Sequence, residues 1–301
     1  METAKTGGQG NPPSAAQAEK DLAYRTGVGN WSAFHLGMDA IYASARKWRE
    51  KMEGVPRAWL CWNVDPDWCL VQQRLAASVG WTPLVGSDPR AEKPRLVPGA
   101  VQIDFNADFH LPTMWMHFPL EFAFLFAERL AFWHSDLLVR REKLQRIAEN
   151  FAALPDGSMT VSVPRRGLRE TLFKRGTRRY WELIGCTTRG ASRSQFEQGC
   201  GWWMNFAAHP NCPGEDERLR RKRFYWDHGA GILYWAEKCG GQVAKIKEAE
   251  VEEGHCTRIS NVNYQRLSPD TAERLLPTEL RHNFSLVKVC RDLGLEDLLK
   301  D

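Results

Sequence analysis

The chain has 301 residues, of which 43 % are hydrophobic and 26 % charged, the balance of a globular protein with a sizeable core. The net charge of +4 is a mild excess that does not by itself imply nucleic-acid binding. The most apolar run, residues 118–133, contains Glu121, Glu128 and Arg129, so it is too short and too charged to span a bilayer. No secretory signal is recognisable and the cysteines form no C-x-x-C pair, so we expect reduced thiols and a cytoplasmic location.

Composition along the chain divides it into four parts. Residues 1–20 hold almost no apolar side chain and are expected to form a disordered tail. Residues 21–54 are expected to be a helical lead-in, with the helical pattern clearest towards residue 52. Residues 55–250 alternate between strand and helix patterns, and residues 251–301 form a C-terminal extension that is helical around Leu286–Leu293.

A strand–helix–strand unit opens the main part of the chain. Arg57–Asn63 is a short apolar run between chain breakers, which predicts a buried strand. Asp65 suits a helix N-cap and Pro66 the first helical position, so a helix is expected to about Val79. Trp81–Gly86 then reads as a second strand, which completes the building block of a parallel sheet.

The same alternation continues along the main part of the chain. Further strands are expected at Ala100–Asp104, Leu130–Asp136, Ser158–Val163, Tyr180–Cys186 and Gln242–Ile246. Further helices are expected at Pro119–Arg129, 140–153 and Gly231–Lys238. This order predicts an α/β fold with a doubly wound, mostly parallel central sheet, helices on both faces and a helical C-terminal extension. In such sheets ligands gather at the carboxyl ends of the strands.

Two groups of polar residues follow predicted strands. Asp65 and Asp67 could hold a divalent cation or a ribose hydroxyl, whereas the alternative is a helix start, which explains Asp65, Pro66 and Asp67 without a ligand. His134 and Asp136 end an apolar run, and side chains two apart on a strand point to the same side. They could therefore reach one cation, whereas the alternative is a strand end with Asp136 bonded to nearby backbone.

Basic and aromatic residues form a third feature. Residues 164–179, which include Arg165 and Arg166, and residues 218–223 are rich in Arg and Lys. Such stretches could clamp phosphates, bind nucleic acid or form solvated loops. The thirteen Trp residues predict either a heavily aromatic core or a face that stacks on sugars or bases.

The layout of residues 55–250 resembles a glycosyltransferase of the GT-A fold. Asn63-Val-Asp65 lies where such enzymes bind the nucleoside, and His134-Ser-Asp136 lies where they show Asp-x-Asp. Gly199–Asn205, which contains Gly and Trp, resembles the acceptor-side region, and His255 could fill a downstream metal position. The first acid of the usual triplet is a histidine here, an imidazole that can still ligate manganese.

The resemblance implies transfer of a sugar from a nucleotide diphosphate donor to a hydroxyl acceptor, with Mn²⁺ or Mg²⁺ as cofactor. It places the metal on His134, Asp136 and His255. It implies donor contacts from Asn63, Asp65, Asp67, Arg165 and Arg166, and acceptor contacts from Trp202, Trp203 and Asn205. Catalytic roles fall to Asp136 and, as candidate bases, to Glu197 and Asp227.

Two other classes of function stay open from the sequence. A non-enzymatic protein could use the Trp and Arg residues to bind a glycan or a nucleic acid, with an affinity for nucleic acid that falls steeply as salt rises. A metal-dependent hydrolase could be built on His134, Asp136 and His255, with tight zinc or iron binding and no preference for nucleotides.

Overall fold

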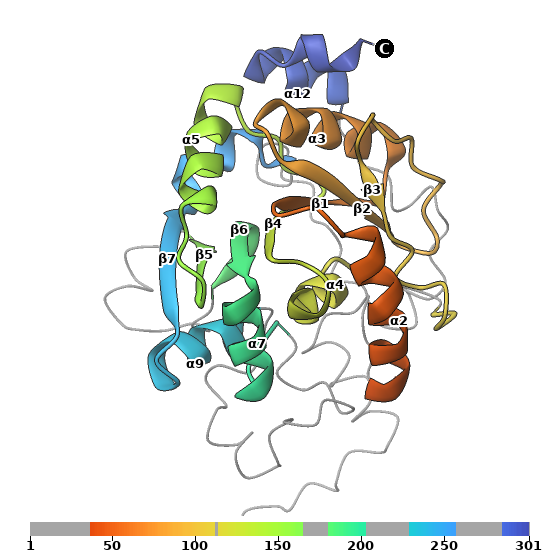
Figure 1. Cartoon of the computed structure of the whole chain (residues 1–301). Helices are drawn as coiled ribbons and strands as arrows, with labels where there is room; N and C mark the ends of the chain where they lie inside the picture. The colour runs from red at the N-terminus through yellow and green to blue at the C-terminus, as the bar shows by residue number, and fades with distance from the viewer. Residues whose placement is uncertain (1–36, 112–113, 165–179, 203–228, 257–284, 301) are drawn as a thin grey trace, which may run out of the picture.

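The computed structural model describes residues 37–111, 114–164, 180–202, 229–256 and 285–300. A seven-stranded sheet in the order β3-β2-β1-β4-β6-β5-β7 forms the centre of the molecule (Figure 1). Its strands are β1 Ala58–Asn63, β2 Thr82–Ser87, β3 Val101–Gln102, β4 Arg129–Trp133, β5 Ser158–Val163, β6 Trp181–Thr188 and β7 Gln242–Lys247. Only β6 runs antiparallel to its neighbours, β4 and β5.

Helices cover both faces of this sheet. They are α2 Met38–Lys51, α3 Pro66–Ser78, α4 His117–Glu121, α5 Arg141–Ala152, α7 Arg189–Glu197, α9 Ala230–Lys238 and α12 Leu286–Leu293, with short 3₁₀ turns η2 Ala123–Leu125, η4 Glu248–Glu250, η5 Glu252–Gly254 and η7 Glu296–Leu299. Because successive strand side chains point to opposite faces, Trp59 and Trp133 pack with α3, α5 and α12, whereas Leu60 and Phe132 pack with α2, α4, α7 and α9. None of the helices in the described ranges is long and apolar enough to cross a membrane.

The predicted α/β fold with a mostly parallel central sheet is confirmed, and two predicted elements are wrong. A helix at Pro119–Arg129 was expected, but the chain forms the short α4, the 3₁₀ turn η2 and then β4. Phe118 and Phe122 are among the aromatic residues buried on every side there. The apolar residues of this segment therefore show no helical periodicity from which the length of a helix could be predicted. The predicted strand to Asp136 stops at Trp133, and the next residues turn.

The tryptophans described in the structure are mostly core residues, as the first of the two interpretations predicted. Trp59, Trp133 and Trp81 are buried on the α3 face, and the ring centroids of Trp59 and Trp133 lie 4.7 Å apart. Trp48 packs against the edges of four phenylalanine rings on the opposite face. These rings fix the sheet between two aromatic layers.

The strand order reverses at β1. The chain passes from β1 outward through β2 to β3, and then returns to β4 on the other side of β1. Leu60 of β1 pairs with Phe132 of β4, so these two parallel strands end close to the same level. Such a reversal opens a crevice outside the carboxyl ends of the two strands, and ligands bind there in open α/β sheets.

Candidate metal centre

His134 and Asp136 lie in a tight turn directly after β4. The backbone N–H of Leu137 donates to the carbonyl oxygen of His134 at 3.1 Å. Gln72, fully buried on α3, donates through Nε2 to the carbonyl oxygens of His134 at 2.8 Å and Leu137 at 2.9 Å. The turn is therefore held by the helix that follows β1, and the carboxyl ends of β1 and β4 are linked.

His255 reaches the same turn from the C-terminal part of the chain. A two-residue bridge pairs it antiparallel with Leu137, and the N–H of Cys256 donates to the carbonyl oxygen of Asp136 at 3.1 Å. The N–H of Leu138 donates to the carbonyl oxygen of Gly254, also at 3.1 Å. A Cβ at Gly254 would overlap the carbonyl oxygen of Leu138, so only glycine allows this close backbone approach.

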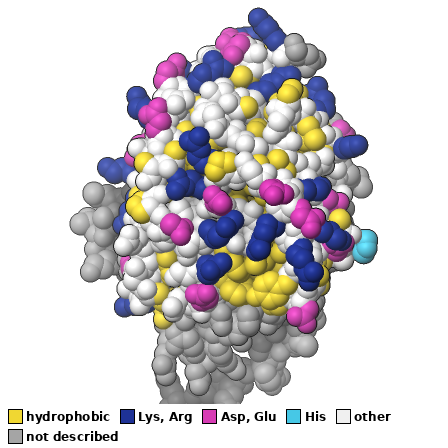
Figure 2. Space-filling model, viewed as in Figure 1, with side chains coloured by type: hydrophobic (Ala, Val, Ile, Leu, Met, Phe, Trp, Pro, Cys, Tyr) yellow, Lys and Arg dark blue, Asp and Glu magenta, His cyan; other side chains and the backbone are white. Residues whose placement is uncertain are grey.

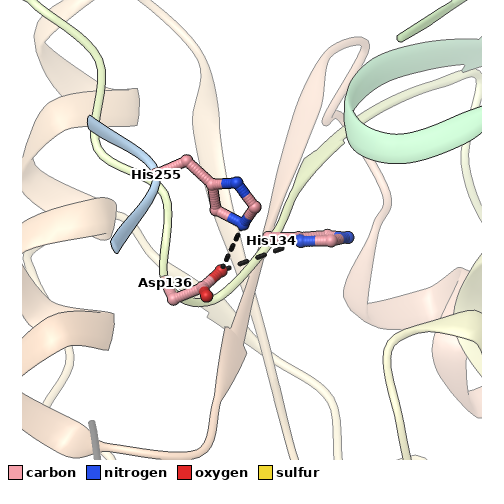
Figure 3. Close-up of side chains that lie close together, drawn as sticks. All are labelled: His134, Asp136 and His255. Atoms are coloured by element: carbon pink, nitrogen blue, oxygen red, sulfur yellow. Dashed lines mark ion pairs between the residues drawn. The ribbon is translucent and has the colours of Figure 1, made fainter. Parts of the chain in front are cut away.

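The three side chains converge around one carboxylate oxygen (Figure 3). Asp136 Oδ1 lies 3.7 Å from His134 Nδ1 and 3.5 Å from His255 Nε2, and the group offers three ligand atoms within 4.8 Å of one another. Both separations exceed the length of an N–H···O hydrogen bond, about 2.7–3.2 Å. They are close to the ~3.4 Å that separates two ligands on a tetrahedral zinc with bonds of about 2.1 Å. The donor set therefore fits a divalent cation.

Two of the three side chains in this group are buried in the protein, and the third is partly exposed. Asp136 and His255 are buried, whereas the side chain of His134 retains 21 % of its exposure. The indole of Trp181 meets both imidazoles edge-on, with ring centroids 5.5 Å from His134 and 5.4 Å from His255. Burial also raises the pKa of the neighbouring Cys256 thiol, so in the metal-free protein this sulfur stays protonated at neutral pH.

A second buried carboxylate lies behind His134. Glu182 of β6 has its Oε1 3.6 Å from His134 Nε2 and 3.2 Å from Nε2 of His117 on α4. Sequence analysis missed both residues, although each is a lone ionisable residue within an apolar segment. Buried charges are costly unless they are compensated. One divalent cation would offset the negative charges that Asp136 and Glu182 carry when both are ionised.

The residues predicted after β1 lie at the N-terminus of α3. Asp65 caps this helix by accepting hydrogen bonds from the backbone N–H groups of Asp67 at 3.0 Å and Trp68 at 3.2 Å, which confirms the helix-start interpretation. Asn63 is buried, and its Nδ2 donates to Ser87 Oγ at 3.1 Å and to the carbonyl oxygen of Glu92 at 2.8 Å. Asn63 thus ties the carboxyl end of β1 to that of β2.

A hollow of about 280 Å³ opens beside this helix N-terminus. It is lined by Asp65, Pro66, Asp67, Glu92, Lys93 and Arg95. Arg95 pairs with Asp67 at 2.5 Å, and both side chains are exposed. The hollow therefore offers hydrogen-bonding groups of both charges at the carboxyl end of β1.

A larger hollow, of about 670 Å³, lies at the amino-terminal ends of the strands, next to the residues that precede β1 and β4. Its charged lining mixes Arg46, Arg49 and Arg189 with Glu50, Glu53 and Glu128. Figure 2 shows both acidic and basic side chains on one face of the molecule, with several Lys and Arg side chains beside a hydrophobic area.

The other predicted site residues are distributed as follows. Glu197 is exposed at the end of α7, and Trp202 is buried with its ring 5.4 Å from that of Phe132. The remaining predicted residues lie outside the described part of the chain: Arg165, Arg166, Trp203, Asn205 and Asp227.

No known protein family, curated protein or solved structure matches this chain. Its function therefore has to be inferred from the chemistry of the site, because a fold alone does not determine an activity.

Proposed function

We propose that this chain is a glycosyltransferase that moves a sugar from a nucleotide diphosphate donor to a hydroxyl acceptor. The observation that carries the proposal is the position of His134, Asp136 and His255 at the carboxyl end of β4, beside β1, where the strand order reverses. This is the crevice in which open α/β sheets bind nucleotides.

The donor set supports a metal that is shared between protein and diphosphate. Cations that handle phosphates are commonly bound by one or two carboxylates together with phosphate oxygens of the substrate. Asp136 supplies a carboxylate oxygen, and His134 and His255 supply two imidazole nitrogens. Imidazole disfavours Mg²⁺, so Mn²⁺ fits better of the two expected ions. When bound, the cation would neutralise the charge that develops on the departing diphosphate.

The end of β1 supports a contact with the nucleoside. Asp65 and Asp67 present carboxylate oxygens to the hollow of about 280 Å³, where they can accept hydrogen bonds from ribose hydroxyls. Asn63 is fully buried and does not line this hollow, so through its hydrogen bonds to Ser87 and Glu92 it supports the end of β1 from behind rather than contacting the nucleoside. In this proposal the nucleoside lies against β1 and the diphosphate extends towards β4.

The acceptor side of the proposal rests on residues that the sequence resemblance assigns. An inverting reaction needs a carboxylate that removes the proton of the acceptor hydroxyl. Glu197 and Asp227 are the candidates for this base. Trp203 and Asn205 are the proposed acceptor contacts, whereas Trp202, assigned to the same role from the sequence, is buried against Phe132 and belongs to the core.

A metal-dependent hydrolase is the second candidate, because two imidazoles and one carboxylate also form the ligand set of catalytic zinc and non-haem iron sites. In that case the open metal position would take water rather than a diphosphate oxygen. The second candidate predicts tight zinc or iron binding and no preference for nucleotides.

A donor screen tests the proposal. Release of nucleoside diphosphate is measured for a panel of uridine- and guanosine-diphosphate sugars with Mn²⁺, with and without hydroxyl acceptors. The wild type should turn over one donor class, Asp136→Asn should be inactive, and Asp39→Asn, an exposed aspartate on α2, should match the wild type. Hydrolysis of simple esters with zinc, without any response to nucleotide sugars, would favour the hydrolase instead.

A further inference from the structure

Glu182 is a buried carboxylate that the proposed reaction does not yet use. Its side chain is 5 % exposed, and so is that of His117, its neighbour on α4. Glu182 Oε1 lies between two imidazole nitrogens, 3.2 Å from His117 Nε2 and 3.6 Å from His134 Nε2. The first contact is close enough for ionic attraction, although it lacks the alignment of a regular hydrogen bond. An ionised carboxylate in such a place needs compensating groups, and the N–H groups of these two rings together with the charge of a bound cation would supply them.

The backbone fixes Glu182 relative to the metal centre. β6 runs antiparallel to β4, with Trp133 opposite Ile184. One residue further along, the N–H of His134 donates to the carbonyl oxygen of Leu183 at 2.9 Å. The residue that begins the metal turn is therefore bonded to the neighbour of Glu182, so the sheet holds the backbones that carry the two side chains next to each other.

The two nitrogens of His134 face two different carboxylates. Nδ1 lies 3.7 Å from Asp136 Oδ1, and Nε2 lies 3.6 Å from Glu182 Oε1. A neutral imidazole carries one proton, and the nitrogen without it is the one that can bind a metal. Histidine ligands in metal sites commonly donate their other N–H to a carboxylate, which fixes the tautomer and the orientation of the ring.

We infer that Glu182 is a positioning residue for the metal centre: its Oε1, 3.6 Å from His134 Nε2, attracts the imidazole proton to that nitrogen electrostatically and thereby leaves Nδ1 directed at the cation. His117 holds Glu182 from the α4 side, so the arrangement runs from the cation through His134 and Glu182 to His117. The inference rests on the metal site of the proposed function, and it adds a residue that reaches the cation only through His134.

Metal affinity of the full-length chain tests this role. Mn²⁺ and Zn²⁺ binding is measured by calorimetry for the wild type, Glu182→Gln and a surface control, Glu149→Gln, which is exposed on α5. Glu182→Gln should bind both ions roughly 10–100-fold more weakly, as loss of a carboxylate behind a histidine ligand does in other metal sites. Glu149→Gln should bind them as the wild type does.

A second set of variants separates positioning from a merely structural role. Glu182→Asp keeps the charge and should recover part of the affinity lost in Glu182→Gln. His117→Gln should weaken binding less, and its effect should largely disappear in the Glu182→Gln background, because it acts through Glu182. In Co²⁺-loaded protein the visible spectrum should change in Glu182→Gln and return towards that of the wild type in Glu182→Asp.

The outcomes distinguish this inference from the proposed function. If the wild type binds neither ion, the metal site fails and the inference fails with it. If Asp136→Asn loses metal while Glu182→Gln retains the affinity and spectrum of the wild type, only the role of Glu182 is refuted. If Glu182→Gln does not fold, Glu182→Asp and His117→Gln decide: unchanged affinity in both overturns the inference.

Discussion

Replacing Gly254 with alanine should separate His255 from Asp136. The added Cβ would overlap the carbonyl oxygen of Leu138 and would also come within 3.2 Å of Leu293 Cδ1 on α12. Because the closest atoms belong to the backbone of Leu138, no side-chain rotation can remove the overlap. The turn that carries His255 must therefore move away from the turn that carries Asp136.

The expected cost follows from the contacts that this movement disturbs. Inserting a methyl group into a packed site costs about 1–3 kcal/mol. The hydrogen bonds from Leu138 N–H to Gly254 and from Cys256 N–H to Asp136 are each worth about 0.5–1.5 kcal/mol. We expect a loss of about 3 kcal/mol in the free energy of unfolding, which corresponds to a fall of roughly 6–12 °C in melting temperature for a chain of this size.

Calorimetric melting and metal titration of Gly254→Ala check this prediction together. Gly37→Ala is the control, since a Cβ at Gly37 meets no atom within 4 Å. Gly254→Ala should lose both stability and metal affinity, whereas Gly37→Ala should keep both. A Gly254→Ala protein with the melting temperature and metal affinity of the wild type would refute the proposed approach of the two turns.

Three further outcomes are expected. Gln72→Leu deprives two buried carbonyl groups of their donor and should lower the free energy of unfolding in urea by about 2–4 kcal/mol, so wild-type stability would show that Gln72 does not hold the metal turn. The N–H of Gly190 donates to Asp156 at 2.8 Å and lowers the pKa of this carboxyl, so Asp156 should stabilise the fold above its unfolded pKa of ~3.9. The difference in unfolding free energy between wild type and Asp156→Ala should then shrink as the pH falls through the lowered pKa of Asp156 in the folded protein. A difference that persists in strong acid would contradict this. Hydrogen peroxide should oxidise Cys200 and Cys239, whose sulfurs lie 3.9 Å apart, to a disulfide with release of water, and mass spectrometry should show the loss of two hydrogens rather than two intact thiols.

The first strand–helix–strand unit was predictable because its signals are local. Asp65 and Pro66 mark the start of α3 in the sequence, and both act as the pattern indicated. The direction of β6 was not predictable, because its residues read as a strand whichever way the chain enters the sheet. Its antiparallel pairing with β4 and β5 is decided by tertiary contacts.

The residues of the metal centre also differ in how far the sequence could predict them. His134 and Asp136 stand out because polar residues end an apolar run, whereas His255 was assigned only through the resemblance to a known layout. Glu182 and His117 were missed because nothing in their own segments shows that β6 and α4 meet behind His134. A lone acid inside an apolar strand is nevertheless a usable signal, since a buried carboxylate requires a partner.

Binding of nucleoside diphosphates, with and without Mn²⁺, tests the central claim most directly. UDP and GDP are titrated into the wild type and into Asp136→Asn, and thermal stability is followed in the same samples. One nucleotide should bind the wild type only when Mn²⁺ is present, and at about 100 times its Kd it should stabilise the fold by about 2.7 kcal/mol. Asp136→Asn should show neither effect. Equal binding in the presence of a chelator, or no binding of either nucleotide with Mn²⁺, would contradict a metal-bound diphosphate at the ends of β1 and β4.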